Sequence, residues 1–183
     1  PLYGRAFECY SEDPLLSGKL AAAYIRGVQS QGVATTVKHF VGNEAEFERM
    51  TIDSVIDERT LREVYLLPFE LAVREGGSLG IMTSYNRMNG LYGPDNKWLL
   101  DNVLRGEWGF EGFVITDWFA GFETETAAEA GLDLEMPAPA RAYGKHLAEA
   151  VKEGRVDESR LDRAVHKLLE VFDRVGALDD EPV

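Results

Sequence analysis

The stretch Gly112-Phe113-Val114-Ile115-Thr116-Asp117-Trp118 places a carboxylate and an indole ring directly after a short apolar run. Such a run, bounded by glycine and by polar residues, is typical of a buried strand. Two upstream runs end in a similar way. Thr35–Phe40 carries Lys38 and His39 near its end, and Leu79–Tyr85 ends in a phenol. Because the carboxyl ends of parallel strands meet at one edge of a sheet or barrel, these polar side chains outline one site.

Helical and strand-like patterns alternate along the chain. Asp13 and Pro14 are typical of a helix start, and Pro68 is expected to kink or interrupt the second helix. The polar stretch 42–56 is expected to be a functional loop, and Asn89-Gly90 a turn. We expect strands at 33–40, 79–85, 113–116 and 131–136, with helices after Asp13, Asp57 and Asn96 and at 123–130, 143–153 and 157–174.

This order of elements implies a parallel sheet with right-handed crossovers. Both a doubly wound sheet and a barrel satisfy it. Every expected strand ends in a polar side chain, whereas a doubly wound sheet gathers its ligand groups near one switch point. The pattern therefore predicts an α/β fold that is part of a (β/α)8 TIM-like barrel. A whole barrel typically needs about 250 residues, so the 183 residues present would form about four βα units.

Composition and charge narrow the classes of ligand. The formal net charge is −13, from 32 acidic and 19 basic residues. Such a surface repels nucleic acid and anionic membranes and suits a neutral ligand, although solubility alone explains it equally well. Cys9 is the only cysteine, which excludes an internal disulfide and a thiolate metal cluster. We expect no metal site, no cofactor and no membrane span. A cytoplasmic location is slightly favoured, with periplasmic or secreted locations left open.

Each candidate residue also has an ordinary structural interpretation. A lone aspartate after a strand, such as Asp117, more often caps the next helix. Lys38 and His39 could be a surface lysine beside a core histidine. The sole role of Arg5 could be to fasten its own loop by an ion pair with Glu8. Tyr85 could be an aromatic residue of the rim. Only their combination is specific.

Six stretches, in order, resemble family 3 of the glycoside hydrolases, the β-glucosidase and β-xylosidase group. The similarity covers nearly the whole chain. It implies a (β/α)-barrel catalytic domain that hydrolyses a β-linked sugar with retention of configuration. The stretches are GRAFECYSEDP (4–14), KHFVGNEAEFER (38–49), DERTLREVYLLPFE (57–70), MTSYNRMNG (82–90), GFEGFVITDW (109–118) and AGLDLEMP (130–137).

The resemblance also implies roles for individual residues. Asp117 matches the nucleophile, Tyr85 a phenol that orients it, and Trp118 an aromatic platform beside the leaving group. Four side chains match those that bind the ring hydroxyls of the glycone: Arg5, Lys38, His39 and Arg49. Planar guanidinium and ammonium groups supply the directional donors that a neutral sugar needs.

Other acidic residues and one departure from the family refine this interpretation. Glu46 is expected to support Lys38 or Arg49, and Glu135 and Asp133 to anchor loops at the rim of the barrel. The hexosaminidase branch of the family follows its Lys-His-Phe with a proline and a Gly-His-Gly run. Here Phe40 precedes Val-Gly-Asn-Glu at 41–44. A terminal β-D-glucosyl or related glycone is therefore the better expectation.

The resemblance further implies partners for the chain. Family barrels have about four strands before the first matching stretch, one carrying an aspartate that binds the sugar. The acid/base glutamate comes from the following domain. We therefore expect residues 1–183 to be the C-terminal portion of the barrel, inactive and not compact when isolated. Its partners would be the remaining barrel and the acid/base domain, or a complementary chain, together with a β-linked glucoside or oligosaccharide.

Three other functions stay open on the sequence alone. Family 3 barrels can become glycoside phosphorylases when phosphate replaces water. A sugar-binding or assembly module could keep the glycone residues without an acid. An aldolase-type barrel could use Lys38 as a Schiff base, although the adjacent His39 and the Asp117-Trp118 pair fit a sugar site better.

Overall fold

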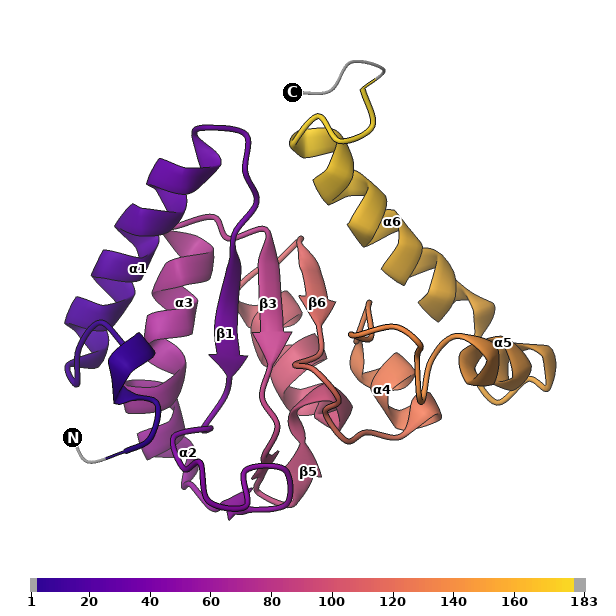
Figure 1. Cartoon of the computed structure of the whole chain (residues 1–183), viewed down its shortest axis with the longest axis horizontal. Helices are drawn as coiled ribbons and strands as arrows, with labels where there is room; N and C mark the ends of the chain where they lie inside the picture. Colours follow the sequence, from indigo (N-terminus) through magenta and orange to yellow (C-terminus); the bar gives the residue numbers. More distant parts are fainter. Residues whose placement is uncertain (1–2, 180–183) are drawn as a thin grey trace.

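A short parallel sheet forms the centre of the structure, a computed structural model that describes residues 3–179. Its strands are β1 (Thr36–Phe40), β3 (Gly80–Thr83) and β6 (Phe113–Ile115), in the order β1-β3-β6 (Figure 1). Ile115 forms a parallel bridge with Leu134, which continues the same order. The prediction of an α/β fold with a parallel sheet is confirmed. The fourth expected strand, 131–136, is reduced to this one bridge.

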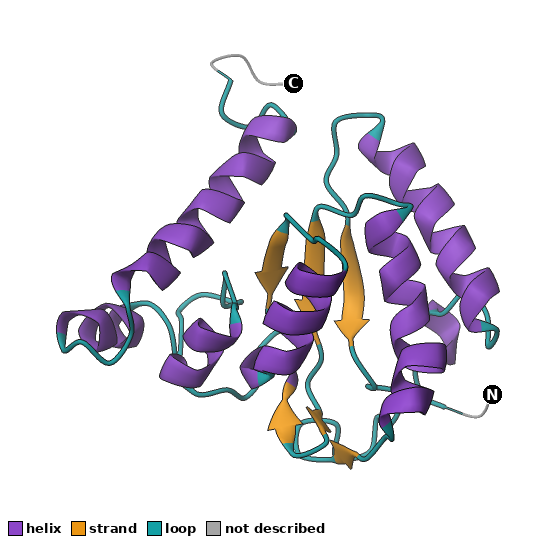
Figure 2. Ribbon diagram, turned by 180° about the vertical axis from the view of Figure 1, so that it is seen from behind, coloured by secondary structure: helices purple, strands orange, loops and turns teal. Residues whose placement is uncertain are grey.

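Helices cover the sheet and connect its strands (Figure 2). In α1 (Pro14–Gln29), the Asp13 side chain accepts a hydrogen bond from the Leu16 N–H at 2.9 Å, as its N-cap position predicts. The short helix η1 (Ala6–Glu8) precedes α1, and η3 (Gly93–Asp95) precedes η4. The remaining connections are η4 (Trp98–Glu107), which is π-helical, α4 (Thr124–Ala130), α5 (Lys145–Lys152) and α6 (Glu158–Arg174).

The second expected helix is continuous but changes its winding. It consists of α2 (Glu58–Thr60), the π-helical η2 (Leu61–Leu66) and α3 (Leu67–Arg74). The interruption predicted at Pro68 takes the form of the widened turns just before it. Proline has no N–H to donate and its ring crowds the preceding turn, so a local π-helical segment accommodates it. The helix stays long enough for α3 to pack beside α1 (Figure 1).

A second, small sheet was not predicted. Its strands are β2 (Asp53–Ser54), β4 (Arg87–Met88) and β5 (Leu91–Tyr92). Asn89 and Gly90 form the expected turn between β4 and β5, with positive φ angles of 51° and 92° that suit a two-residue hairpin. The sheet closes the polar stretch 42–56 against the segment after β3.

Two acidic side chains fasten the region around β6. Asp133 accepts hydrogen bonds from the Val114 N–H at 2.7 Å and from Arg105 Nη2 at 2.6 Å. Glu135 accepts bonds from the backbone N–H groups of residues 141, 142 and 143, with the shortest distances 2.7 Å. Glu135 therefore anchors a loop, as predicted, whereas Asp133 fastens the strand itself.

The apolar core lies between the sheet and its helices. Phe40 is fully buried, and its ring makes edge contacts with Phe69 and Trp108 at centroid distances of 5.1 and 5.9 Å. Ile81 and Val114 on the neighbouring strands are also fully buried. Among the described residues, no helix is both long enough and apolar enough to span a bilayer.

We predict that Gly112→Ala destabilises the fold whereas Gly27→Ala does not. A Cβ on Gly112 would overlap the backbone carbonyl of Leu79, where β3 meets β6, and backbone cannot move aside easily. Overpacking of this kind costs about 1–3 kcal/mol. Gly27 lies within α1, and apart from the helix's own backbone nothing would lie within 4 Å of the new Cβ, so alanine there should stabilise by up to about 1 kcal/mol. Urea unfolding of the full-length gene product measures the stability of both variants. Equal unfolding midpoints for Gly112→Ala and Gly27→Ala would contradict the close approach of Gly112 to the Leu79 carbonyl.

Candidate active site

Asp117 and His39 meet at the carboxyl ends of the central strands. His39 lies in β1, and Asp117 follows β6 by two residues. The Asp117 side chain is only 11 % exposed, and its Oδ2 lies 3.3 Å from His39 Nε2. Its Oδ1 accepts a hydrogen bond from the Trp118 N–H at 2.7 Å. The strand ends thus converge on one carboxylate, as the sequence indicates.

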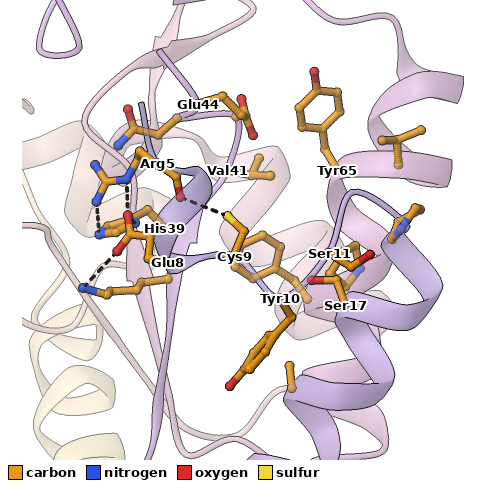
Figure 3. A pocket seen from close by; sticks show the side chains of 18 of the residues that line it. Arg5, Glu8, Cys9, Tyr10, Ser11, Ser17, His39, Val41, Glu44 and Tyr65 are labelled. Atoms are coloured by element: carbon orange, nitrogen blue, oxygen red, sulfur yellow. Dashed lines mark hydrogen bonds and ion pairs between the residues drawn. The ribbon is translucent and has the colours of Figure 1, made fainter. Parts of the chain in front are cut away.

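Arg5 approaches His39 from the N-terminal segment. Its Nη2 lies 2.9 Å from His39 Nε2 (Figure 3). A guanidinium nitrogen can only donate, so this ring nitrogen accepts, and the histidine carries its proton on Nδ1. Burial, and then the charge of Arg5, lower the pKa of His39 to about 4. At neutral pH His39 is therefore an uncharged ring between a cation and a carboxylate.

Arg5 is itself held by two glutamates. Its Nε donates to Glu8 at 2.5 Å, and its Nη1 to Glu46 at 3.2 Å. Glu46 also accepts a hydrogen bond from Arg49 Nη1 at 2.9 Å. Glu46 therefore supports Arg49, as expected, and joins it to Arg5.

Tyr85 brings Arg49 into the same group of side chains. The Arg49 guanidinium lies 4.7 Å above the centre of the Tyr85 ring. Burial, together with a hydrogen bond to Asp117, raises the pKa of Tyr85 to about 12. The phenol thus remains a hydrogen-bond donor to Asp117 over the physiological pH range, although Arg49 and Arg5 act against the shift.

Lys38 and Trp118 lie further towards the solvent. Lys38 Nζ is 3.8 Å from Glu8 Oε2 and its side chain is half exposed. Trp118 is 55 % exposed. The structure thus brings five of the seven predicted residues into mutual contact and leaves these two at the edge.

Glu8 is the acidic residue that sequence reasoning undervalued. It contacts Arg5 and Lys38, and its Oε1 lies 3.9 Å from His39 Nδ1. The three-residue spacing from Arg5 signals an ion pair on a short helix, but nothing in the sequence shows that the pair faces His39.

A cavity of about 410 Å³ opens beside Arg5 and His39. It lies between the N-terminal segment, the end of β1 and the helix that contains Tyr65 (Figure 3). Glu44 lines it, and burial raises the pKa of this carboxyl group. Among residues 3–179, no group of three or more His, Cys, Asp or Glu side chains is arranged to hold a metal ion.

Asp117 is thus a buried residue at the carboxyl end of a parallel strand, in the same group of side chains as Arg5 and Arg49. The profile of the glycosyl hydrolase family 3 N terminal domain matches residues 1–171. The chain belongs to this family, as the resemblance predicted.

Relatives and solved structures agree. The chain is 54 % identical over 181 residues to a β-glucosidase of Rhizobium radiobacter, covering 99 % of this chain and 22 % of that protein. It matches β-glucosidase 3B of Thermotoga neapolitana in complex with glucose with a TM-score of 0.91 and 46 % identity, over 97 % of this chain and 26 % of that one. The chain also matches the β-glucosidase DesR of Streptomyces venezuelae in complex with D-glucose, with a TM-score of 0.94 and 38 % identity, over 100 % of this chain and 25 % of that one. The chain thus spans about a fifth of the length of the curated relatives it matches.

We predict that His39 makes the protein less stable in mild acid. The pKa of His39 is lowered in the folded state, so between about pH 6.5 and pH 4 the unfolded chain binds a proton that the folded chain does not. Stability is therefore lost as the pH falls through this range. From pH 7 to pH 5 the loss from this group is about 2 kcal/mol.

His39→Gln should reduce the loss of folding stability between pH 7 and pH 5, measured by urea unfolding at each pH. His166→Gln on α6, where the side chain is 68 % exposed, is the control and should leave it unchanged. An acid sensitivity that is the same in His39→Gln and in the unmodified protein would show that His39 titrates normally.

Proposed function

We propose that this chain carries the nucleophile of a retaining β-glucosidase-like hydrolase, and that the nucleophile is Asp117. The observation that carries the proposal is the buried Asp117 carboxylate at the end of β6, which accepts a hydrogen bond from the Trp118 N–H and helps to raise the pKa of the neighbouring Tyr85 phenol. Fixed donors hold a carboxylate oxygen in one orientation, which is what in-line attack on an anomeric carbon requires.

In the proposed reaction a carboxylate oxygen of Asp117 bonds to the anomeric carbon as the bond to the leaving oxygen breaks. The leaving oxygen takes a proton from an acid, and water later releases the sugar. Retention needs a second carboxyl group about 5–5.5 Å from the first. Glu8 and Glu46 are both engaged with arginines, which makes them poor proton donors. As the family resemblance implies, the acid is proposed to come from another domain.

The glycone is proposed to be a terminal β-D-glucosyl residue. Arg5, Lys38, His39 and Arg49 would hold its hydroxyl groups, with Trp118 beside the leaving group. The names of the relatives favour hydrolysis over phosphorolysis, since those compared above are β-glucosidases. The neighbours from Thermotoga neapolitana and Streptomyces venezuelae hold glucose, which supports this choice of sugar.

We also propose that residues 1–183 form the C-terminal portion of a (β/α)8 barrel. The strands β1, β3 and β6 and the bridge at Leu134 follow one another in chain order, as barrel strands do. Among the described strands, β1 pairs only with β3, so its other edge can pair with a preceding barrel strand.

We predict that Asp117→Gly lowers kcat for p-nitrophenyl β-glucoside by several orders of magnitude, because the covalent step is lost. The assay uses the full-length gene product. Asp101→Asn is the control, because Asp101 lies in η4 and pairs with Lys97 away from the site. A 2-deoxy-2-fluoroglucoside should label the peptide that contains Asp117; labelling of another carboxylate would remove Asp117 from the role.

We predict that Arg5→Ala and Arg49→Ala each lower kcat/KM by about 30-fold or more. A sugar hydroxyl that loses a charged partner costs about 2–5 kcal/mol of transition-state binding. Arg26→Ala on α1, which loses a bond to the Glu75 carbonyl, is the matched control. Circular dichroism would verify folding. Unchanged kcat/KM in a folded Arg5→Ala protein would refute a role in sugar binding.

A further inference from the structure

His39 Nε2 faces two side chains that make opposite demands on it. Arg5 Nη2 lies 2.9 Å from this nitrogen, and a guanidinium N–H can only donate. Asp117 Oδ2 lies 3.3 Å from the same nitrogen, and an ionised carboxylate can only accept. A proton on Nε2 would suit Asp117 and oppose Arg5, whereas a lone pair there suits Arg5. One ring nitrogen cannot meet both demands at once.

Arg5 is held firmly enough to decide between them. Its Nε donates to Glu8 at 2.5 Å and its Nη1 to Glu46 at 3.2 Å, so Nη2 is the group directed at His39 (Figure 3). The side chains of Arg5 and His39 are 12 % and 6 % exposed, so little water screens their contact. Arg5 therefore imposes the lone pair on Nε2, which leaves the proton on Nδ1.

The other charged groups around His39 act in both directions. Lys38 disfavours a protonated ring, as Arg5 does, whereas Asp117 and Glu8 favour it. Burial and the charge of Arg5 outweigh the two carboxylates and lower the pKa of His39 to about 4. Without the charge of Arg5, burial and the half-exposed Lys38 alone would oppose the carboxylates. His39 would then take up a proton at a higher pH.

Protonation of His39 would change the state of Asp117. An N–H on Nε2 would donate to Asp117 Oδ2, and the two groups would form an ion pair. Asp117 Oδ1 already accepts from the Trp118 N–H at 2.7 Å. Both carboxylate oxygens would then hold a hydrogen bond that an attacking oxygen has to give up. The uncharged ring donates no hydrogen bond to Oδ2, so this oxygen keeps its reactivity.

We propose that Arg5 is a positioning residue for the nucleophile: it keeps His39 uncharged with its Nε2 lone pair towards Asp117, and this contact sets the lower pH limit of activity. The inference rests on the proposed glucosidase function and specifies how pH regulates the same site. With His39 uncharged, an electron pair of Asp117 Oδ2 forms the bond to the anomeric carbon. The electron pair of the broken bond leaves with the aglycone oxygen, which takes its proton from the acid of the other domain. Activity is therefore present above the pKa of His39 and is lost as the pH falls through it.

The test is the pH dependence of kcat/KM for 2,4-dinitrophenyl β-glucoside in the full-length gene product. This quantity reports ionisations of the free enzyme, and the leaving group needs little protonation, so the acid of the other domain contributes little. Arg5→Gln should move the acid limb of the profile to higher pH by about one unit or more. Arg5→Lys keeps the charge and should hold the limb near its position in the unmodified protein. A residue that only bound sugar would lower kcat/KM by the same factor at every pH.

Two further variants assign the shift to His39. Arg49→Gln removes a cation whose partners are Glu46 and Tyr85 rather than His39, so it should lower kcat/KM without moving the acid limb. The double variant Arg5→Gln/His39→Gln should return the limb to the lower pH, because the group that titrates is gone. A limb that stays raised in the double variant would assign the titration to another group and overturn the proposal.

The outcomes separate this inference from the proposed function. An acid limb at the same pH in Arg5→Gln and in the unmodified protein would refute the positioning role, while the glucosidase function stands. If the unmodified protein cleaves neither this substrate nor p-nitrophenyl β-glucoside, the proposed function fails and the pH limit fails with it. Urea unfolding then judges the contact alone. Arg5→Gln should reduce the loss of folding stability between pH 7 and pH 5, and an unchanged loss would refute the effect of Arg5 on His39.

Discussion

The burial of the Asp117 carboxylate is the constraint on which the site depends. A carboxyl side chain that is 11 % exposed is costly to bury unless hydrogen-bond donors satisfy it. The Trp118 N–H does so from the next residue in the chain. Tyr85, whose pKa Asp117 helps to raise, follows β3, so it comes near Asp117 because β3 and β6 run parallel in a fixed register. A shift of one residue would turn these side chains to the other face. The contacts of Asp133 and Gly112 with the neighbouring strands therefore preserve the geometry of the site as well as the fold.

The apolar runs and helix caps were sufficient to predict the central architecture. The runs at 36–40, 80–83 and 113–115 are strands, and Asp13 and Asp57 cap helices as their positions indicate. The second sheet could not be predicted, because strands of two residues are too short for a period to emerge. The π-helical turns before Pro68 were unexpected for a related reason: sequence pattern shows that the proline perturbs the helix, but the packing decides how.

Site residues on strands were easier to anticipate than the contacts of residues on loops. His39 and Tyr85 lie at strand ends, so topology alone brings them near Asp117. The position of Arg49 over Tyr85 depends on how the stretch 42–56 folds back onto the segment after β3, which only the tertiary structure determines. The same holds for Glu46, which joins two arginines that are 44 positions apart in the chain. Loops carry the specific contacts here, and their closure is a long-range property.

The pairing of cations with glutamates has a consequence for the proposed chemistry. A glycosyl transition state is positively charged near the anomeric carbon, so bare guanidinium groups close to it would oppose the reaction. Arg5 is compensated by Glu8 and Glu46, Arg49 by Glu46, and His39 is neutral because its pKa is lowered. The sugar hydroxyls would thus meet directional donors while the local field stays dominated by the Asp117 carboxylate.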